Sequence, residues 1–183
     1  MTLPNLITIF RLLLVPTIVY LLVAEALLLA FLAFVIAGVS DGIDGLIAKH
    51  FGQATRIGAY LDPLADKALL VSIFVTLGYL HELPLWFVVL VVSRDIFIVA
   101  AVVLSWMVTH PVTMAPVTIS KINTGAQITL AAIVLADLAF GLQWLELREV
   151  GVFLVAALTL ISAATYLVHW VRHMNMGNEG QGF

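Results

Sequence analysis

The chain has 183 residues, of which 63% are hydrophobic and only 10% charged, and its formal net charge is −3. Soluble domains carry roughly 25% charged residues, so this composition excludes an ordinary soluble domain and predicts an integral membrane protein. The few basic residues are scattered, which argues against a nucleic-acid-binding protein, and the absence of cysteine excludes disulfides and cysteine metal sites.

Six apolar stretches approach the length of about 20 residues that a membrane-spanning helix needs. In chain order they cover about Leu6–Val23, Ala26–Ala48, Tyr60–Leu80, Pro84–Val108, Ser120–Leu142 and Val150–Val171. No alternation typical of strands is present, so we expect an all-α membrane protein with six transmembrane helices. We expect residues 1–174 to form one membrane domain and the polar, glycine-rich residues 175–183 to form a disordered tail.

The loops between these helices predict the orientation. With six spans, the loops at 49–59 and 110–120 and both termini lie on one side of the membrane. That side carries Lys49, Arg56, Lys121 and Arg172, and the other carries Arg148, Glu25, Glu82, Glu146 and Glu149. The positive-inside rule therefore places both termini in the cytoplasm.

Four of the eleven acidic residues lie between Asp41 and Asp66, at the cytoplasmic ends of the second and third spans. Residues three or four apart share a helix face, so Asp41 pairs with Asp44, and Asp62 with Asp66. The short loop predicts antiparallel neighbouring helices, which lets the four carboxylates converge in a polar cavity that faces the cytoplasm. Oxygen-only ligands favour Mg²⁺, Mn²⁺ or Ca²⁺, and a pair of such ions suits phosphoryl displacement.

The residues alone allow two other interpretations of this acidic cluster. The carboxylates form a structural charge network with Lys49, Arg56 and Lys67, or they line a cation pathway. Glycines at 42, 45 and 58 would let a nucleotide diphosphate approach the backbone. Gly58 lies either one turn before Asp62 in the same helix or in the loop that enters it.

The spacing of this stretch resembles the signature of the CDP-alcohol phosphatidyltransferases. It reads Asp41-x-x-Asp44-Gly45-x-x-Ala48-Lys49, eight residues, then Gly58-x-x-x-Asp62-x-x-x-Asp66. Eight fixed positions make the pattern very specific. The one departure is Lys49, where the family pattern has arginine, and a lysine lacks the planar fork that holds two phosphate oxygens.

The resemblance implies a six-helix membrane enzyme, usually a homodimer, that uses CDP-diacylglycerol, releases CMP and joins the phosphatidyl group to an acceptor alcohol. Two divalent ions, Mg²⁺ or Mn²⁺, would be held by the four aspartates. Asp66 would also take the proton from the acceptor hydroxyl as general base. Gly45 and Gly58 would line the cytidine site, and Lys49 would lie at the diphosphate.

A further segment, LPNLITIFRLLLVP at 3–16, resembles the entry segment of the cardiolipin synthase and phosphatidylglycerophosphate synthase branches. The segments SRDIFIVAAV at 93–102 and ISKINTGAQ at 119–127 resemble most the CMP-forming cardiolipin synthases. Acceptors in both branches carry a phosphate, for which Arg94 and Lys121 are the candidate ligands. Arg94 alternatively pairs internally with Asp95 or Asp66, and Lys121 and Arg11 alternatively anchor helices at the lipid interface.

Val102 stands where phosphatidylglycerophosphate synthases typically carry another arginine. This replacement favours phosphatidylglycerol over glycerol 3-phosphate as the acceptor, and hence cardiolipin as the product. The expected location is a bacterial inner membrane. A metal-ion transporter or a non-catalytic membrane protein is the alternative of another class.

Overall fold

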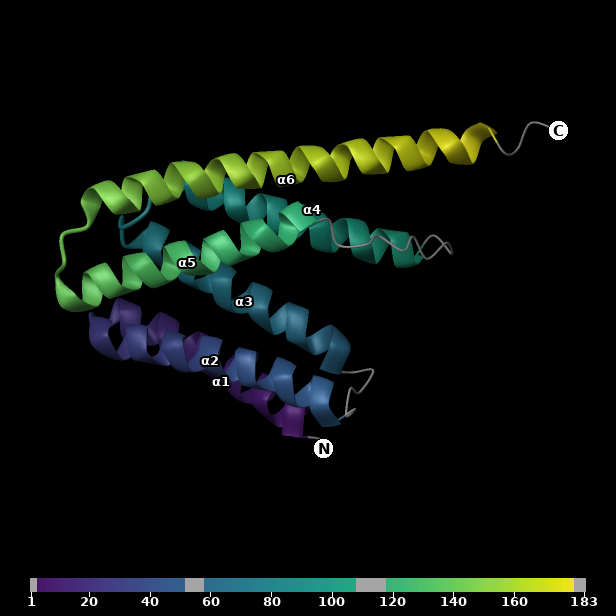
Figure 1. Ribbon diagram of the computed structural model, residues 1–183. Helices are drawn as coiled ribbons and strands as arrows, with labels where there is room; N and C mark the ends of the chain where they lie inside the picture. The colour runs from purple at the N-terminus through teal and green to yellow at the C-terminus, as the bar shows by residue number, and fades with distance from the viewer. Residues whose placement is uncertain (1–2, 52–57, 108–117, 180–183) are drawn as a thin grey trace.

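The computed structural model is a bundle of six helices (Figure 1). The backbone is described for residues 3–51, 58–107 and 118–179, and the side chains for residues 8–40, 65–98 and 119–166. The helices are α1 (Leu3–Val23), α2 (Leu27–Phe51), α3 (Gly58–Tyr79), α4 (Leu85–Met107), α5 (Thr118–Phe140) and α6 (Leu145–Glu179). The described part contains no strand, so the all-α prediction is confirmed there, and each of the six predicted helices is present.

The limits of several helices differ from the predicted limits. The helix α1 begins at Leu3, three residues before the predicted start, and continues through Pro16. The helix α3 begins at Gly58, which places that glycine one turn before Asp62. The helix α6 has 35 residues, because its polar ends extend the helix beyond the apolar run that the hydropathy identifies. It passes the domain boundary predicted at residue 174, which itself stays a prediction.

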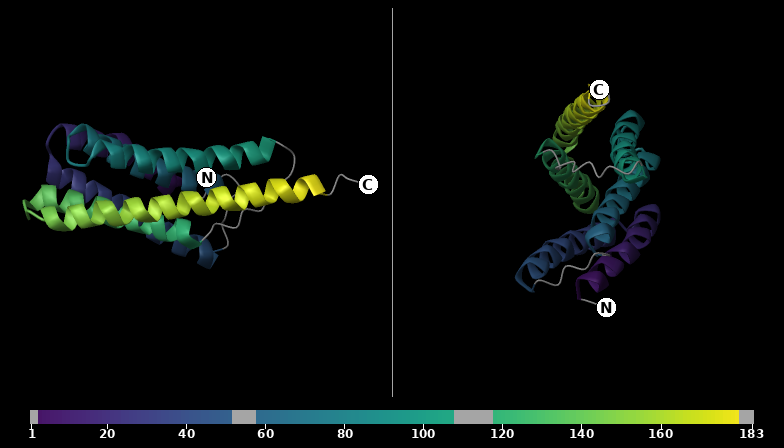
Figure 2. Two further views of the ribbon diagram at one scale, coloured as in Figure 1. Left: turned by 90° about the horizontal axis from the view of Figure 1, so that it is seen from above. Right: turned by 90° about the vertical axis from the view of Figure 1, so that its right-hand side faces the viewer.

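The three tight turns lie at one end of the bundle, and the first residues of α1 and the last of α6 lie at the other (Figures 1 and 2). We call these the closed end and the open end. Each turn contains a left-handed residue, and the next amide donates to a carbonyl five residues back. The left-handed residues are Glu25, His81 and Gly141, and the bonds join Ala26 N to Leu21 O at 2.9 Å, Glu82 N to Leu77 O at 2.9 Å and Leu142 N to Asp137 O at 3.3 Å. This pattern is the Schellman motif, which ends a helix while satisfying its last carbonyls.

Most of the two predicted loops at 49–59 and 110–120 lies outside the described residues. Within the described contacts, α1 packs against both α2 and α3, while α5 packs against α2, α3 and α6. The sequence predicted α2 and α3 to be direct neighbours. The contacts among described residues instead bring both helices against α1 and α5.

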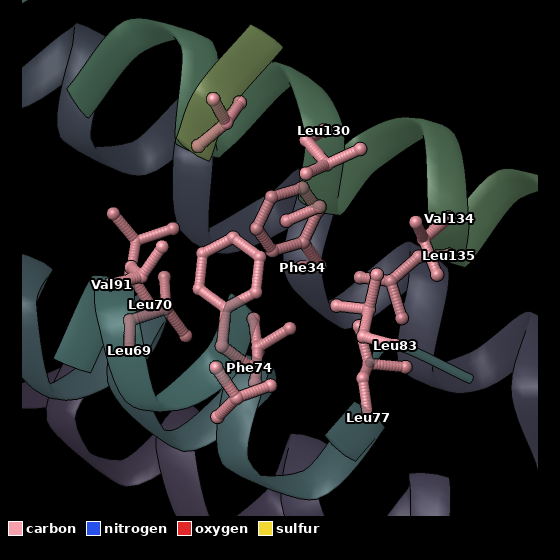
Figure 3. Packing of buried hydrophobic residues seen from close by; sticks show 14 of the residues in the cluster. Phe34, Leu69, Leu70, Phe74, Leu77, Leu83, Val91, Leu130, Val134 and Leu135 are labelled. Atoms are coloured by element: carbon pink, nitrogen blue, oxygen red, sulfur yellow. The ribbon is translucent and has the colours of Figure 1, made fainter. Parts of the chain in front are cut away.

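The core lies between α2, α3, α4 and α5 (Figure 3). Phe34 and Phe74 face Leu130 across this core, and the Phe74 ring meets Phe87 edge-on with centroids 5.7 Å apart. Two glycines let helix backbones approach closely. A Cβ added to Gly78 would lie 2.8 Å from Val88 Cγ2, and one added to Gly151 would lie 2.8 Å from Leu130 Cδ1.

Two described helices are long and apolar enough to cross a membrane, at Ile119–Phe140 and Leu145–Tyr166. Shorter apolar helical stretches occur at Thr8–Val23 and Leu27–Ser40. Length and composition therefore support two of the six predicted crossings, and the number of crossings stays a prediction.

Candidate active site

The helix α3 carries Asp66, the predicted general base, which forms an ion pair with Arg11 of α1. The Arg11 guanidinium is buried, with 1% of its side chain exposed, whereas 40% of the Asp66 side chain is exposed. Arg11 was expected to anchor α1 at the lipid interface. That expectation is wrong, because a snorkelling side chain would be exposed. The pair instead fixes a reachable carboxylate against a buried cation.

The next residue of α3, Lys67, belongs to a second polar group. Its Nζ lies 2.7 Å from Asp95 Oδ1, and Arg94 NH1 of the same helix α4 lies 2.7 Å from the same oxygen. Arg94 NH2 donates to Ser120 Oγ of α5 at 2.8 Å and to Ser162 Oγ of α6 at 2.5 Å. Three helices thus meet at one buried guanidinium, and α3 joins the group through the contact of Lys67 with Asp95.

The aromatic ring of Tyr166 also faces this guanidinium, with 6.0 Å between the ring centroid and Arg94 Cζ. Only 4% of Arg94 and 2% of Asp95 is exposed. The internal pair of Arg94 with Asp95, one of the two expectations for this arginine, is therefore present. Pairing with Asp66 is not seen among the described contacts of Arg94. The predicted role of Arg94 in binding the acceptor stays a prediction.

Polar side chains continue along α5 from this group toward the closed end. Asn123 accepts a hydrogen bond from Thr159 of α6 at 3.1 Å. Gln127, one turn further, is fully buried, and neither polar atom of its amide has a partner among the described groups. Because Ser120, Asn123 and Gln127 are three and four residues apart, they share one face of α5.

The remaining predicted residues fall into two classes. Lys121 is exposed on α5, next to the serine that contacts Arg94. The side chains at the predicted metal and donor positions lie outside the described residues; these positions are Asp41, Asp44, Asp62, Gly45, Lys49 and Gly58.

The donor chemistry of the acidic positions fits a divalent cation such as Mg²⁺ or Mn²⁺. The helix α2 includes Asp41 and Asp44, and α3 includes Asp62 and Asp66, so each pair lies about one turn apart on one helix. Asp66 supplies an accessible carboxylate, and oxygen ligands are the type that these ions prefer. Among the described side chains no three acidic or histidine residues gather, since Asp66 alone of the predicted set belongs to them.

Asp137 lies at the closed end, away from Asp66. Its carboxylate accepts a hydrogen bond from Trp144 N at 3.0 Å and from Arg148 NH1 at 3.1 Å. Arg148 also bonds Glu82 through NH2. These residues join α5, α6 and the turn between α3 and α4.

Sequence reasoning missed the pairing of Arg11 with Asp66 and the contacts of Arg94 with Ser120 and Ser162. A usable signal was present, because charged or hydroxyl-bearing residues inside apolar helices are expected to face the bundle interior and to pair there. What the sequence lacked was the identity of each partner.

Comparison with known proteins shows which family this chain resembles. The sequence profile of one family, described as CDP-alcohol phosphatidyltransferase, matches residues 1–170. A probable cardiolipin synthase (CMP-forming) from Drosophila melanogaster is 35% identical over 144 residues, which cover 70% of this chain and 45% of that protein. The cardiolipin synthase (CMP-forming) from Homo sapiens is 35% identical over 155 residues, which cover 76% of this chain and 52% of that protein.

A CDP-diacylglycerol–glycerol-3-phosphate 3-phosphatidyltransferase from Salmonella choleraesuis (strain SC-B67) is 35% identical over 175 residues, which cover 90% of this chain and 92% of that protein. The chain therefore spans about half the length of the two cardiolipin synthases and nearly all of the bacterial enzyme.

Proposed function

The chain belongs to the CDP-alcohol phosphatidyltransferase family, and we propose that it transfers the phosphatidyl group of CDP-diacylglycerol to a glycerol-type acceptor and releases CMP. The observation that carries the proposal is the eight-position signature between Asp41 and Asp66, within a family match that covers residues 1–170. The names of two relatives, a CMP-forming cardiolipin synthase and a CDP-diacylglycerol–glycerol-3-phosphate 3-phosphatidyltransferase, support a reaction of this kind.

The proposed acceptor is phosphatidylglycerol, which would give cardiolipin. Two cardiolipin synthases among the relatives support it, as does Val102 in place of a further cation. Glycerol 3-phosphate is the second candidate, because the Salmonella relative named for that acceptor matches along nearly its whole length.

In the proposed reaction, the acceptor hydroxyl oxygen forms a bond to the phosphorus that carries the diacylglycerol. The bond from that phosphorus to the oxygen of CMP breaks, and CMP leaves with that oxygen. The hydroxyl proton passes to the carboxylate of Asp66, which Arg11 holds in place while leaving it partly exposed. Arg94 and Lys121 bind the acceptor phosphate, and Gly45, Lys49 and Gly58 bind the CDP group.

Two Mg²⁺ or Mn²⁺ ions would be held by Asp41, Asp44, Asp62 and Asp66. When bound, they would neutralise the diphosphate and stabilise the negative charge on the departing CMP. Without bound cations, several carboxylates close together beside hydrocarbon would be strongly unfavourable. This cost supports the presence of metal ions at these positions.

We propose further that all six helices cross the inner membrane of a bacterium, with both termini and a polar cavity facing the cytoplasm, and that the protein forms homodimers. Large exposed apolar side chains on several helices support contact with lipid; they include Leu13, Leu29, Val89, Phe97 and Phe153. The first residues of α1 and the last of α6 lie at the same end of the bundle, which supports placing both termini on one side (Figure 1).

The decisive experiment measures CMP release by the purified protein with CDP-diacylglycerol and Mg²⁺ or Mn²⁺. We expect release with phosphatidylglycerol and none without an acceptor, and a parallel reaction with glycerol 3-phosphate identifies the second candidate. Asp66→Asn should abolish turnover while CDP-diacylglycerol still binds. Glu146→Gln, at an exposed carboxylate near the closed end, is the matched control and should remain active. Absence of CMP with every acceptor would overturn the proposal.

A further inference from the structure

One buried carboxylate, Asp95, holds two cations from different helices. Lys67 Nζ and Arg94 NH1 both lie 2.7 Å from Asp95 Oδ1. Of the three side chains, those of Arg94 and Asp95 are each 3% exposed, and that of Lys67 is 24% exposed. Two positive charges and one negative charge leave this group with a net charge of +1 in a largely apolar bundle.

The hydrogen-bonding capacity of the group is also incompletely used. Arg94 Nε is buried and donates to no acceptor among the described residues, and Asp95 Oδ2 accepts no hydrogen bond from them. Lys67 Nζ forms an ion pair with Asp95 and makes no further contact to a described acceptor, which leaves part of its three-donor capacity unused. Buried donors without partners are strongly unfavourable in an apolar environment. A group with an excess positive charge and unused hydrogen-bond donors is suited to bind an anion.

We propose that Lys67 is a further binding residue for the acceptor phosphate and that Asp95 is a positioning residue, which holds Lys67 and Arg94 together as one phosphate-binding pair. This inference rests on the proposed function, in which Arg94 and Lys121 bind that phosphate. It adds Lys67, which the sequence assigned only to neutralising the acidic cluster. Serines at 120 and 162 hold the other side of the guanidinium, so Arg94 is fixed before the acceptor arrives.

The position of Lys67 gives the arrangement a consequence for catalysis. Lys67 and Asp66 are consecutive residues with Cα atoms about 3.8 Å apart. A phosphate held by Lys67 therefore lies within one helix turn of the carboxylate that accepts the proton, on the neighbouring face of α3. Binding of the phosphate at this fixed position therefore orients the attacking oxygen of the acceptor.

The test compares Lys67→Met, Lys67→Arg and Asp95→Asn with the parent enzyme, each purified in detergent with CDP-diacylglycerol and Mg²⁺. Lys67→Met should raise the acceptor KM by about tenfold or more, the loss expected for one charge-assisted hydrogen bond. The donor KM should stay within about twofold, and Lys67→Arg should recover most of the loss. An unchanged acceptor KM, or an equal rise in both KM values, would overturn the inference.

Asp95→Asn leaves two buried cations without a counter-ion and is expected to destabilise the fold. The double variant Lys67→Met, Asp95→Asn restores the net charge of +1 and should recover the thermal midpoint. If Asp95 positions a binding pair, the acceptor KM of this double variant stays raised. Recovery of both the thermal midpoint and the acceptor KM would assign the group to structure alone and would overturn the inference.

A binding readout separates this inference from the proposed function. Inorganic phosphate and glycerol 3-phosphate should raise the thermal midpoint of the parent protein and should raise that of Lys67→Met much less. If the parent releases no CMP with any acceptor but shows this difference, the proposed reaction fails while the phosphate site stands. If phosphate stabilises both proteins equally, the phosphate site fails whatever the enzyme assay gives.

Discussion

Replacement of Arg148 by methionine tests how the closed end holds the bundle together. Arg148 NH2 lies 2.7 Å from Glu82 Oε2 and 2.6 Å from the Glu82 carbonyl oxygen, and its NH1 lies 3.1 Å from Asp137 Oδ2. Only 6% of the Asp137 side chain is exposed, so methionine would leave a buried carboxylate whose remaining described donors are the backbone amides of Gln143 and Trp144. Removing one partner of a buried pair costs about 3–5 kcal/mol.

Glu82 adds little to this loss, because its side chain is 33% exposed and a solvated pair contributes about 1 kcal/mol or less. We therefore expect Arg148→Met to lower the free energy of unfolding by about 3–5 kcal/mol. For a chain of this length, such a loss lowers the thermal midpoint by about 10 °C. Denaturant or thermal unfolding in detergent measures it.

The double variant Arg148→Met, Asp137→Asn supplies the internal control. It removes the stranded charge, so it should recover about half or more of the lost stability, because most of the loss comes from the unpaired carboxylate. Glu149→Gln, an exposed neighbour, should change little. A loss below about 1 kcal/mol for Arg148→Met, or no recovery in the double variant, would refute the assignment of a buried pair. Both KM values should stay within about twofold, because the closed end lies away from Asp66.

Three more substitutions test particular contacts. Arg11→Lys should lower kcat by about tenfold with little change in either KM, measured by CMP release, because the shorter cation no longer fixes the Asp66 carboxylate. Gly78→Ala should destabilise the fold by about 1–3 kcal/mol through contact with Val88 Cγ2, and Val88→Ala in the same chain should relieve the loss in thermal unfolding. Lys49→Arg should preserve or lower the KM for CDP-diacylglycerol, since arginine holds two phosphate oxygens, and a large rise would show that the family pattern does not transfer at this position.

The positions of the helices follow from the sequence because a hydrophobic run of about 20 residues has few alternatives in a lipid environment. Hydropathy does not mark the helix ends, because a helix extends beyond its apolar run wherever the flanking polar residues favour helical structure. The helix α6 illustrates this point: it begins at Leu145 and ends at Glu179, beyond both ends of its apolar run.

The partners of the buried charges do not follow from the sequence in the same way. Arg11 and Asp66 are 55 positions apart and meet only because α1 packs on α3. No rule for that packing can be read from the residues, and an arginine near the start of an apolar run is as compatible with interface anchoring as with a buried pair. The spacing of the aspartates was informative for the opposite reason: residues within one helix turn have a fixed geometry whatever the helix packs against.

The two ends of the bundle use charge in opposite ways, and this contrast explains where a reaction site can be built. At the closed end, Arg148 has two carboxylate partners and a carbonyl, and three Schellman motifs satisfy the helix ends. Toward the open end, Lys67 and Arg94 share one carboxylate and retain unused donors. A protein is only marginally stable, so unfavourable groups persist where strong interactions elsewhere offset them. Loss of the Arg148 contacts should therefore lower the stability of the whole bundle, and substitutions at Lys67 should act on acceptor binding first.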